Sequence, residues 1–201
     1  MRWLSFIGIF FASIAAAETG SVTGQVHVSG AIVYVGVTTA SQLPTNAVVE
    51  FRDGELRPHV QVARCAATVA LRNADATLHI VAADWLSGTN PPARVLTQAM
   101  PYTGFVKSLS FEGNRESALV KIAGQNGENS QVAYVALLPT ALAAISDEQG
   151  RFEITGVPAG NYKLFVWHEA LGTRTRDVRV LPGRATNADV EFTSAVPPRS
   201  D

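Results

Sequence analysis

The sequence predicts an all-β protein built from β-sandwiches. Short runs rich in valine, isoleucine and alanine follow one another along the chain, and glycine, proline, asparagine or aspartate separates them. Several runs place apolar residues at every second position, which is the period of a strand with one buried face. No run of ten or more residues has a convincing helical period, and the nearest, residues 136–145, is interrupted by Pro139.

The N-terminal segment has the pattern of a secretory signal peptide. Arg2 supplies a positive charge, residues 3–14 are mostly apolar, and residues 15–17 are the small alanines that precede a cleavage site. The apolar run is shorter than the roughly 20 residues that a membrane-spanning helix needs. We therefore expect cleavage before Glu18, a periplasmic or extracellular protein, and no membrane span after cleavage.

Composition excludes some functions. The chain carries 16 Lys and Arg against 17 Asp and Glu, a net charge of −1, without a basic block. We therefore expect no nucleic acid partner. Cys65 is the only cysteine, which excludes an intramolecular disulfide. A buried, inert thiol is its simplest role, and a reactive thiol or an intermolecular bridge is the alternative.

Strand signals begin directly after the predicted signal peptide, where residues 20–28 carry valines at even spacing. Further short, β-branched runs follow at residues 32–37, 48–51, 60–63, 67–72 and 78–82. We predict a loop over residues 84–104, because three prolines and two glycines are too many for a central strand. Residues 124–131 are polar, contain an Asn-Gly pair and predict a second loop.

The C-terminal part predicts a meander of strands and tight turns. Residues 147–150 (DEQG) and 157–160 (VPAG) are turn sequences, and apolar residues alternate with polar ones on either side of them. A further turn is expected at Pro182 and Gly183 before the last strand. We expect the tail, residues 195–201, to be disordered.

Residues 147–164 (DEQGRFEITGVPAGNYKL) resemble the carboxypeptidase regulatory-like domain. The positions that match its motif are Asp147, Gly150, Phe152, Ile154, Val157, Pro158, Gly160, Tyr162 and Leu164. The resemblance implies an immunoglobulin-like or transthyretin-like β-sandwich. Residues 20–28 resemble the first strand of the same domain, so the sandwich is expected to contain residues 18–50 and 139–194. The order of the two sandwiches stays open, since the stretch between is either an insertion or a separate domain.

The intervening region, residues 51–138, carries a second resemblance. Its residues 56–81 look like the cupredoxin-like half of secreted plastocyanin and methylamine-utilisation-type proteins, in which a Val-Trp-His-Glu sequence also ends the second half. The matching positions are Pro58, Val60, Val62, Val69, Leu71, Asn73, Asp75 and His79. The resemblance therefore implies a cupredoxin-like β-sandwich combined with the regulatory-like one.

The family's copper site is incomplete in this chain. A blue-copper centre needs two imidazoles, a thiolate and a weak axial thioether. His79 matches the first imidazole, but if Val120 aligns with the family, Ile122, Gln125 and Glu128 replace the other ligands. The resemblance thus implies a scaffold without its metal, with copper binding at His79 as the alternative.

The chain shows no motif of an enzyme: no G-x-S-x-G elbow, no H-E-x-x-H helix and no phosphate-binding glycine loop. We expect a non-catalytic binding or assembly protein that recognises a protein partner or a small ligand in the cell envelope. A periplasmic copper-binding electron carrier that uses His79 is the first alternative. Carbohydrate binding through Trp85 or Trp167 is the second.

The candidate ligand-binding residues are Trp167 and His168, in the sequence Val-Trp-His-Glu. An exposed tryptophan face is a common contact for a ligand, whereas the competing interpretation is that Trp167 packs at the end of a strand. His59 and His79 with Asp75 form a weaker candidate metal site, because their spacing matches no zinc motif.

Overall fold

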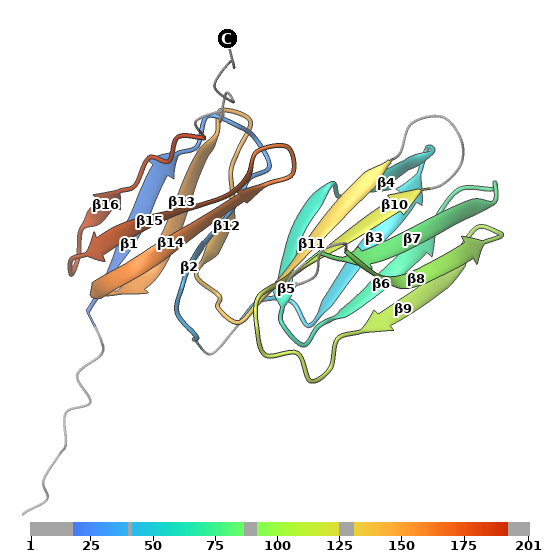
Figure 1. Ribbon diagram of the computed structural model, residues 1–201, viewed down its shortest axis with the longest axis horizontal. Coiled ribbons are helices and arrows are strands. Elements are labelled where there is room, and N and C mark those ends of the chain that lie inside the picture. Colours follow the sequence, from blue (N-terminus) through green and yellow to red (C-terminus); the bar gives the residue numbers. More distant parts are fainter. Residues whose placement is uncertain (1–17, 40–41, 87–91, 125–130, 193–201) are drawn as a thin grey trace, which may run out of the picture.

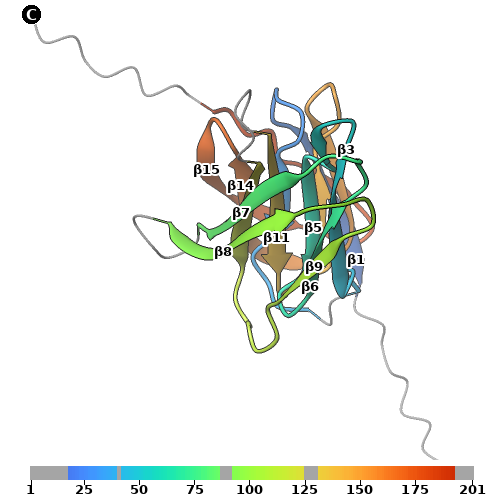
Figure 2. The same cartoon turned by 90° about the vertical axis from the view of Figure 1, so that its right-hand side faces the viewer.

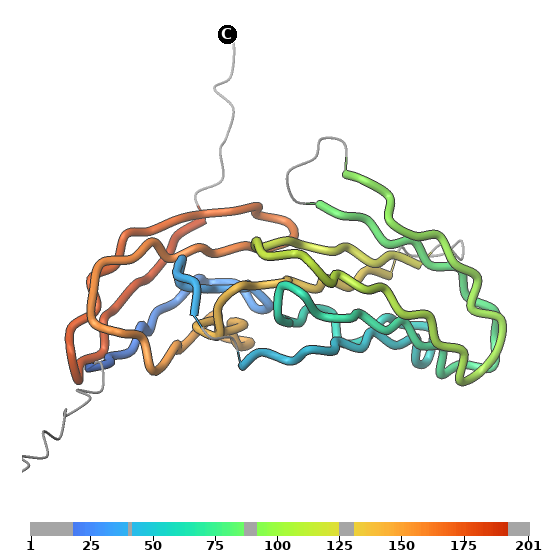
Figure 3. The backbone as a smooth tube through the Cα atoms, turned by 90° about the horizontal axis from the view of Figure 1, so that it is seen from below, coloured from blue at the N-terminus to red at the C-terminus, as the bar shows by residue number. Residues whose placement is uncertain are grey.

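The computed structural model describes residues 18–39, 42–86, 92–124 and 131–192, and this part of the chain folds into strands without a helix. The strands form two β-sandwiches, which lie next to each other in Figure 1 and one behind the other in Figure 2. The backbone trace in Figure 3 shows the elongated outline that results. Within the described residues, no helix is long and apolar enough to cross a membrane. The predicted signal peptide, most of the predicted loop at residues 124–131 and the predicted tail lie outside the described residues.

Both ends of the described chain contribute to one sandwich, which we call the terminal sandwich. Its first sheet has the strand order β13-β1-β16 and its second the order β12-β2-β14-β15. The strands are β1 (Thr19–Gln25), β2 (Ile32–Val35), β12 (Ala143–Ile145), β13 (Arg151–Pro158), β14 (Gly160–His168), β15 (Gly172–Val180) and β16 (Ala185–Asn187). Alternate residues such as Val22, Ile154, Leu164 and Val166 fill the core between the two sheets.

The remaining strands form the second sandwich, which we call the inserted sandwich. Its sheets have the orders β5-β11-β10-β7-β8 and β4-β3-β6-β9. The strands are β3 (Asn46–Arg52), β4 (Glu55–Arg57), β5 (Val60–Arg64), β6 (Thr68–Asn73), β7 (His79–Trp85), β8 (Ala93–Met100), β9 (Val106–Ser110), β10 (Ala118–Gly124) and β11 (Val132–Leu138). Phe51, Leu71, Val120 and Ile122 lie in its separate core.

The inserted sandwich enters the terminal one between two neighbouring strands. β2 and β12 pair antiparallel, with Tyr34 opposite Ala143 and Ile32 opposite Ile145. The pairing continues beyond the strands, where the Val35 amide donates to the carbonyl of Leu142 at 2.9 Å. The chain therefore leaves and returns at adjacent points, and the strands on either side of the insertion belong to one sandwich.

Two sequence-based boundaries need correction. The first strands were expected to extend to residue 50, but β3 begins at Asn46 and pairs with β6 in the inserted sandwich. The loop predicted for residues 84–104 contains β8, which pairs with β7 alone. Pro92 and Pro101 lie just outside this strand, and an edge strand tolerates such flanking prolines because only one of its sides is paired.

The predicted turn at residues 147–150 holds the two parts of the terminal sandwich together. Asp147 Oδ1 accepts hydrogen bonds from the backbone amides of Gln149 and Arg151, at 3.0 and 2.8 Å. Gly150 has a positive φ of 75°, and its carbonyl accepts the amide of Val26 at 2.8 Å. The turn is therefore tied both to its own loop and to the end of β1.

Gly150→Ala is expected to destabilise the terminal sandwich by at least about 2 kcal/mol. A Cβ atom at this position would lie 2.7 Å from the backbone nitrogen of His27, in addition to the cost of the positive φ. Gly172→Ala is the matched control, because Gly172 has a φ of 73° but open space around its Cβ position. It should cost about 1 kcal/mol in urea unfolding. Equal losses would contradict the steric explanation.

Candidate ligand groove between the sandwiches

The two sandwiches meet through a small apolar cluster. Its buried members are Ile32 of β2 and Ala136 and Leu138 of β11. Partly buried side chains surround them, among them Leu119 of β10 and Trp167 of β14. The cluster is separate from both sandwich cores, and it draws residues from strands that are distant in the sequence.

A groove of about 260 Å³ lies within this interface. None of the described residues that line it is charged. They are Ile32, Tyr34, Leu86, Ser117, Ala118, Leu119, Ala136, Leu138, Phe165, Trp167 and Thr173. The terminal sandwich supplies the aromatic wall, on which the rings of Tyr34 and Phe165 stack with centroids 5.1 Å apart. The inserted sandwich supplies an opposing wall of mostly aliphatic side chains.

Strand geometry explains why Trp167 belongs to this wall. Successive side chains of a strand point to opposite faces. On β14, Leu164 and Val166 face the core of the terminal sandwich, whereas Phe165 and Trp167 face the groove. Register places Trp167 opposite Ile32 on one side and Thr173 on the other. The groove residues of the terminal sandwich therefore come from three adjacent strands of one sheet, β2, β14 and β15.

The structure separates the two candidate ligand-binding residues. Trp167 lines the groove, but His168 is the next residue and points to the other face of the sheet. Its ring lies 6.3 Å from that of Phe192, and its Nδ1 accepts the amide of Ala170 at 3.3 Å. These contacts give His168 a local role in the β14–β15 turn. Of the two candidate ligand-binding residues, only Trp167 lines the groove.

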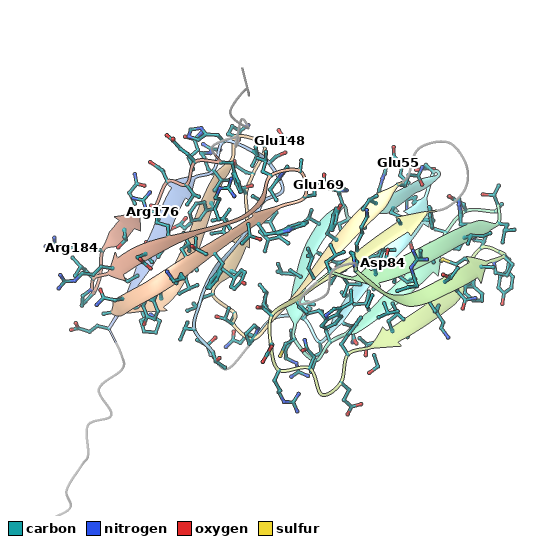
Figure 4. The ribbon with its side chains drawn as sticks, in the orientation of Figure 1. Glu55, Asp84, Glu148, Glu169, Arg176 and Arg184 are labelled. Carbon is teal, nitrogen blue, oxygen red and sulfur yellow. The ribbon has the colours of Figure 1, made fainter. Side chains whose placement is uncertain are left out.

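An ion pair connects the two sandwiches beside the groove. The Nε2 atom of His59, just before β5, lies 2.9 Å from Oε1 of Glu169, which follows β14. The Nδ1 atom of His59 lies 2.8 Å from the carbonyl oxygen of Val132. Because both partners are acceptors, the ring satisfies them together only when both of its nitrogens carry a proton. Figure 4 labels Glu169 on the side of the terminal sandwich that faces the inserted one.

Tyr134 links this ion pair to the groove. Its ring lies edge-on to His59, with centroids 5.8 Å apart, and 4.9 Å from the ring of Trp167. Burial, followed by the charge and the hydrogen bonding of Glu169, raises the pKa of Tyr134 to about 12. The phenol therefore stays protonated over the physiological range, and the aromatic contacts hold Trp167 in one orientation.

Sequence reasoning missed most of this site. Tyr34 was only part of a predicted strand, Phe165 was not singled out, and His59 was only a weak metal candidate. A usable signal was present, since residues 32–35 (IVYV) and 164–167 (LFVW) are continuously apolar. Such runs indicate strands that are covered on both faces.

The predicted metal residue His79 belongs to a hydrogen-bonded turn in the inserted sandwich. Its ring stacks on Phe51 with centroids 4.0 Å apart, and its side chain is 8% exposed. Nε2 donates to Oδ2 of Asp75 at 2.9 Å. The described residues contain no cluster of three or more His, Cys, Asp or Glu side chains that could hold a metal ion.

Asp75 is the centre of that turn. Its two carboxylate oxygens accept the amides of Asp53 and Gly54, at 2.8 and 2.9 Å, in the β3–β4 hairpin. Burial by itself raises the pKa of Asp75, but the amides of Gly54 and Asp53 and the contact with His79 outweigh it and hold this pKa below its ordinary value. Asn73, which is fully buried, donates to the carbonyls of Thr77 and Met100 and completes the turn.

The other residues of the metal and carbohydrate hypotheses are dispersed. Ile122, aligned with the family's copper-binding cysteine, is buried in the core of the inserted sandwich. Gln125 and Glu128 lie outside the described residues. Cys65 precedes β6 and His79 follows it, so they lie beyond opposite ends of that strand. Trp85 packs against the core of the inserted sandwich, with its ring 5.5 Å from that of Phe111.

A double-mutant cycle on His59→Ala and Glu169→Ala should give a coupling energy of about 0.2–1 kcal/mol. The side chains are 52% and 34% exposed, so solvent screens the pair. The coupling is expected to decrease with added salt, because dissolved ions screen the attraction between exposed charges. Lys163 and Asp177, an ion pair within the terminal sandwich, provide the comparison. A His59–Glu169 coupling that stays the same in high salt would refute the assignment of this contact as an ion pair.

Asp75→Asn should destabilise the inserted sandwich by about 1–3 kcal/mol at pH 7, because an amide cannot accept both backbone donors and the imidazole as the carboxylate does. The folded-state pKa is lowered, so the stabilisation by ionised Asp75 is complete above the unfolded-state pKa and disappears as the pH falls through the folded-state pKa. Urea unfolding from pH 7 to pH 3 should show the wild-type advantage shrinking in acid.

Asp177→Asn is the control for this pH series, since the side chain of Asp177 is 85% exposed. We expect this variant to change the free energy of unfolding little at any pH. A cost of Asp75→Asn that stays constant down to pH 3 would show that the carboxylate charge is not what stabilises the turn.

Comparison with known proteins bears on the terminal sandwich. A family model of the carboxypeptidase regulatory-like domain matches residues 116–193. The match includes β12 to β16 and extends back through β10 and β11 of the inserted sandwich, whereas β1 and β2 lie outside it. Neither the curated proteins nor the solved structures gave a match, and the cupredoxin-like resemblance stays a prediction. The chain therefore contains a carboxypeptidase regulatory-like domain, whose fold is an immunoglobulin-like β-sandwich.

Proposed function

We propose that this chain is an exported, non-catalytic binding protein whose ligand occupies the groove between the two sandwiches. The ligand is a small, uncharged, apolar molecule with a ring or a short acyl group. The observation that carries the proposal is the groove itself, in which Tyr34, Phe165 and Trp167 face aliphatic side chains across an interface. The carboxypeptidase regulatory-like domain is regulatory rather than catalytic, and it supports a binding role.

The chemistry of the lining favours an apolar ligand. Ser117 and Thr173 are the polar residues among those that line the groove, and both are exposed. A charged ligand would lose its hydration without gaining a partner of opposite charge. A sugar would leave most of its hydroxyl groups without hydrogen bonds, which counts against the carbohydrate alternative. A flat apolar group instead gains contact with both walls.

The size of the groove limits the ligand. Pockets for drug-sized molecules are about 300–1,000 Å³. A volume of about 260 Å³ lies below that range and suits a compact ligand. The Tyr34–Phe165 stack and the Tyr134–Trp167 contact order the aromatic wall before a ligand arrives, which lowers the entropic cost of binding.

Export is part of the same proposal. The sequence of residues 1–17 has the pattern of a cleaved signal peptide. A periplasmic or extracellular binding protein would meet small apolar molecules before they cross the inner membrane. Mass spectrometry of the protein recovered from the periplasm or medium should give a mature N-terminus at Glu18.

The groove is expected to bind N-phenyl-1-naphthylamine, an uncharged fluorescent probe, with a dissociation constant in the micromolar range. Energy transfer from Trp167 to the probe should quench tryptophan emission. Ser117→Arg should weaken binding about tenfold or more, because it places a charge at the mouth of an apolar groove. The measurement is a fluorescence titration of the mature protein.

Two controls make the result specific. Ser108→Arg adds the same charge at an exposed position of β9 in the same sandwich and should leave binding unchanged. Trp167→Phe should reduce the quenching more than Trp85→Phe, because Trp167 lines the groove whereas Trp85 packs against the inserted core. Binding that survives Ser117→Arg, or quenching that Trp85→Phe reduces more than Trp167→Phe does, would show that the probe lies elsewhere.

A further inference from the structure

A second cleft, of about 550 Å³, lies at one end of the inserted sandwich. It shares no lining residue with the groove between the sandwiches and has a polar character. Its lining comes from the beginning of β3, the β5–β6 turn and the β9–β10 connection: Thr45, Asn46, Arg64, Cys65, Ala66, Thr68, Ser110, Glu112 and Arg115. This cleft has no part in the binding of an apolar ligand.

Arg64 is the unusual residue of the cleft. Its backbone is fixed, because its amide donates to the carbonyl of Pro44 at 3.0 Å and its carbonyl accepts the amide of Ala67 at 2.8 Å. The Nε atom of its guanidinium is buried and has no hydrogen-bond partner among the described residues. A buried donor without an acceptor is costly, and such groups are rare in native proteins.

Five of the described arginines (Arg52, Arg57, Arg72, Arg94 and Arg151) have a carboxylate partner within reach. Arg52 lies 2.7 Å from a carboxylate oxygen of Glu50, and Arg151 lies 2.8 Å from one of Asp147. Arg64 forms no such ion pair with the described residues, although it is less exposed than either of these arginines. Because Arg64 lines the cleft, an anion bound there would give its guanidinium the negatively charged partner that the described residues do not supply.

A second guanidinium lies in the same cleft on a braced loop. Asn114 donates from Nδ2 to the carbonyls of Cys65 and Glu116, each at 2.9 Å, and so fixes the β9–β10 connection beside the β5–β6 turn. Arg115 follows directly and lines the cleft. Among the described residues of the lining, Arg64 and Arg115 carry positive charge and Glu112 alone is acidic, so their charges sum to a net positive value.

We propose that this cleft binds a small oxyanion, a carboxylate or phosphate group, with Arg64 as its principal ligand. The fork of a guanidinium matches the paired oxygens of either group and forms charge-assisted hydrogen bonds to them. Thr45, Thr68 and Ser110 line the same cleft, and their hydroxyl groups are further donors for the remaining oxygens.

The direct test is calorimetric titration of the full mature protein with inorganic phosphate and, separately, with succinate, at constant ionic strength. We expect a dissociation constant in the millimolar range or below for at least one of the two anions. Tighter binding of phosphate would identify a phosphate site, and tighter binding of succinate a carboxylate site. Arg64→Gln should weaken that binding about tenfold or more, and Arg115→Gln should weaken it less. Arg72→Gln, an exposed arginine of the same sandwich that pairs with Glu50, should change it less than about twofold.

A stability measurement separates this role from a structural one. Arg64→Met removes the unsatisfied donor, so without an anion the variant should unfold at the same urea concentration as the wild type or a higher one. Added phosphate or succinate should then stabilise the wild type and not the variant. The proposal is overturned if the wild type binds neither anion up to about 50 mM, or if Arg64→Gln binds as well as the wild type.

Discussion

The antiparallel pairing of β2 with β12 is the constraint on which the rest of this structure depends. It joins Ile32, Val33 and Tyr34 to Ile145, Ala144 and Ala143 across more than one hundred residues of sequence. Because the two strands are neighbours in one sheet, the ends of the insertion lie side by side. The entropy cost of closing a loop grows only slowly with its length. A whole second sandwich can therefore occupy this loop while the terminal sandwich keeps an intact core.

The same pairing creates the interface between the sandwiches. β2 and β14 have one face in the terminal core and leave the other face, with Tyr34, Phe165 and Trp167, uncovered by their own sandwich. The inserted sandwich covers that face only in part, and the groove lies between them, with Ala136 and Leu138 among the residues of its opposing wall. The groove is thus a consequence of incomplete packing between two well-packed bodies.

The residues around His79 that match the cupredoxin-like motif form a hydrogen-bonded turn in the inserted sandwich. Asn73, Asp75 and His79 fall in the pattern that suggested a copper ligand, and each has defined protein partners in the fold. Asp75 joins the β6–β7 turn to the β3–β4 hairpin, where Asp53 and Gly54 both have positive φ values, as a two-residue hairpin turn requires. These hydrogen bonds hold together one end of the inserted sandwich.

Local patterns in the sequence determined the all-β class and the turn at residues 147–150, because strand period and turn chemistry act over a few residues. The motif in residues 147–164 indicated the regulatory-like domain. The turn predicted over residues 157–160 is shorter in the structure, where β13 ends at Pro158 and β14 begins at Gly160. Local patterns also located Trp167. The tertiary structure decided that His168 points away from Trp167 and that His59 meets Glu169 across an interface. It also decided that Arg64 lacks a partner for its buried Nε among the described residues. Such juxtapositions depend on which strands become neighbours, and a pairing between residues a hundred positions apart leaves no periodic trace in either segment.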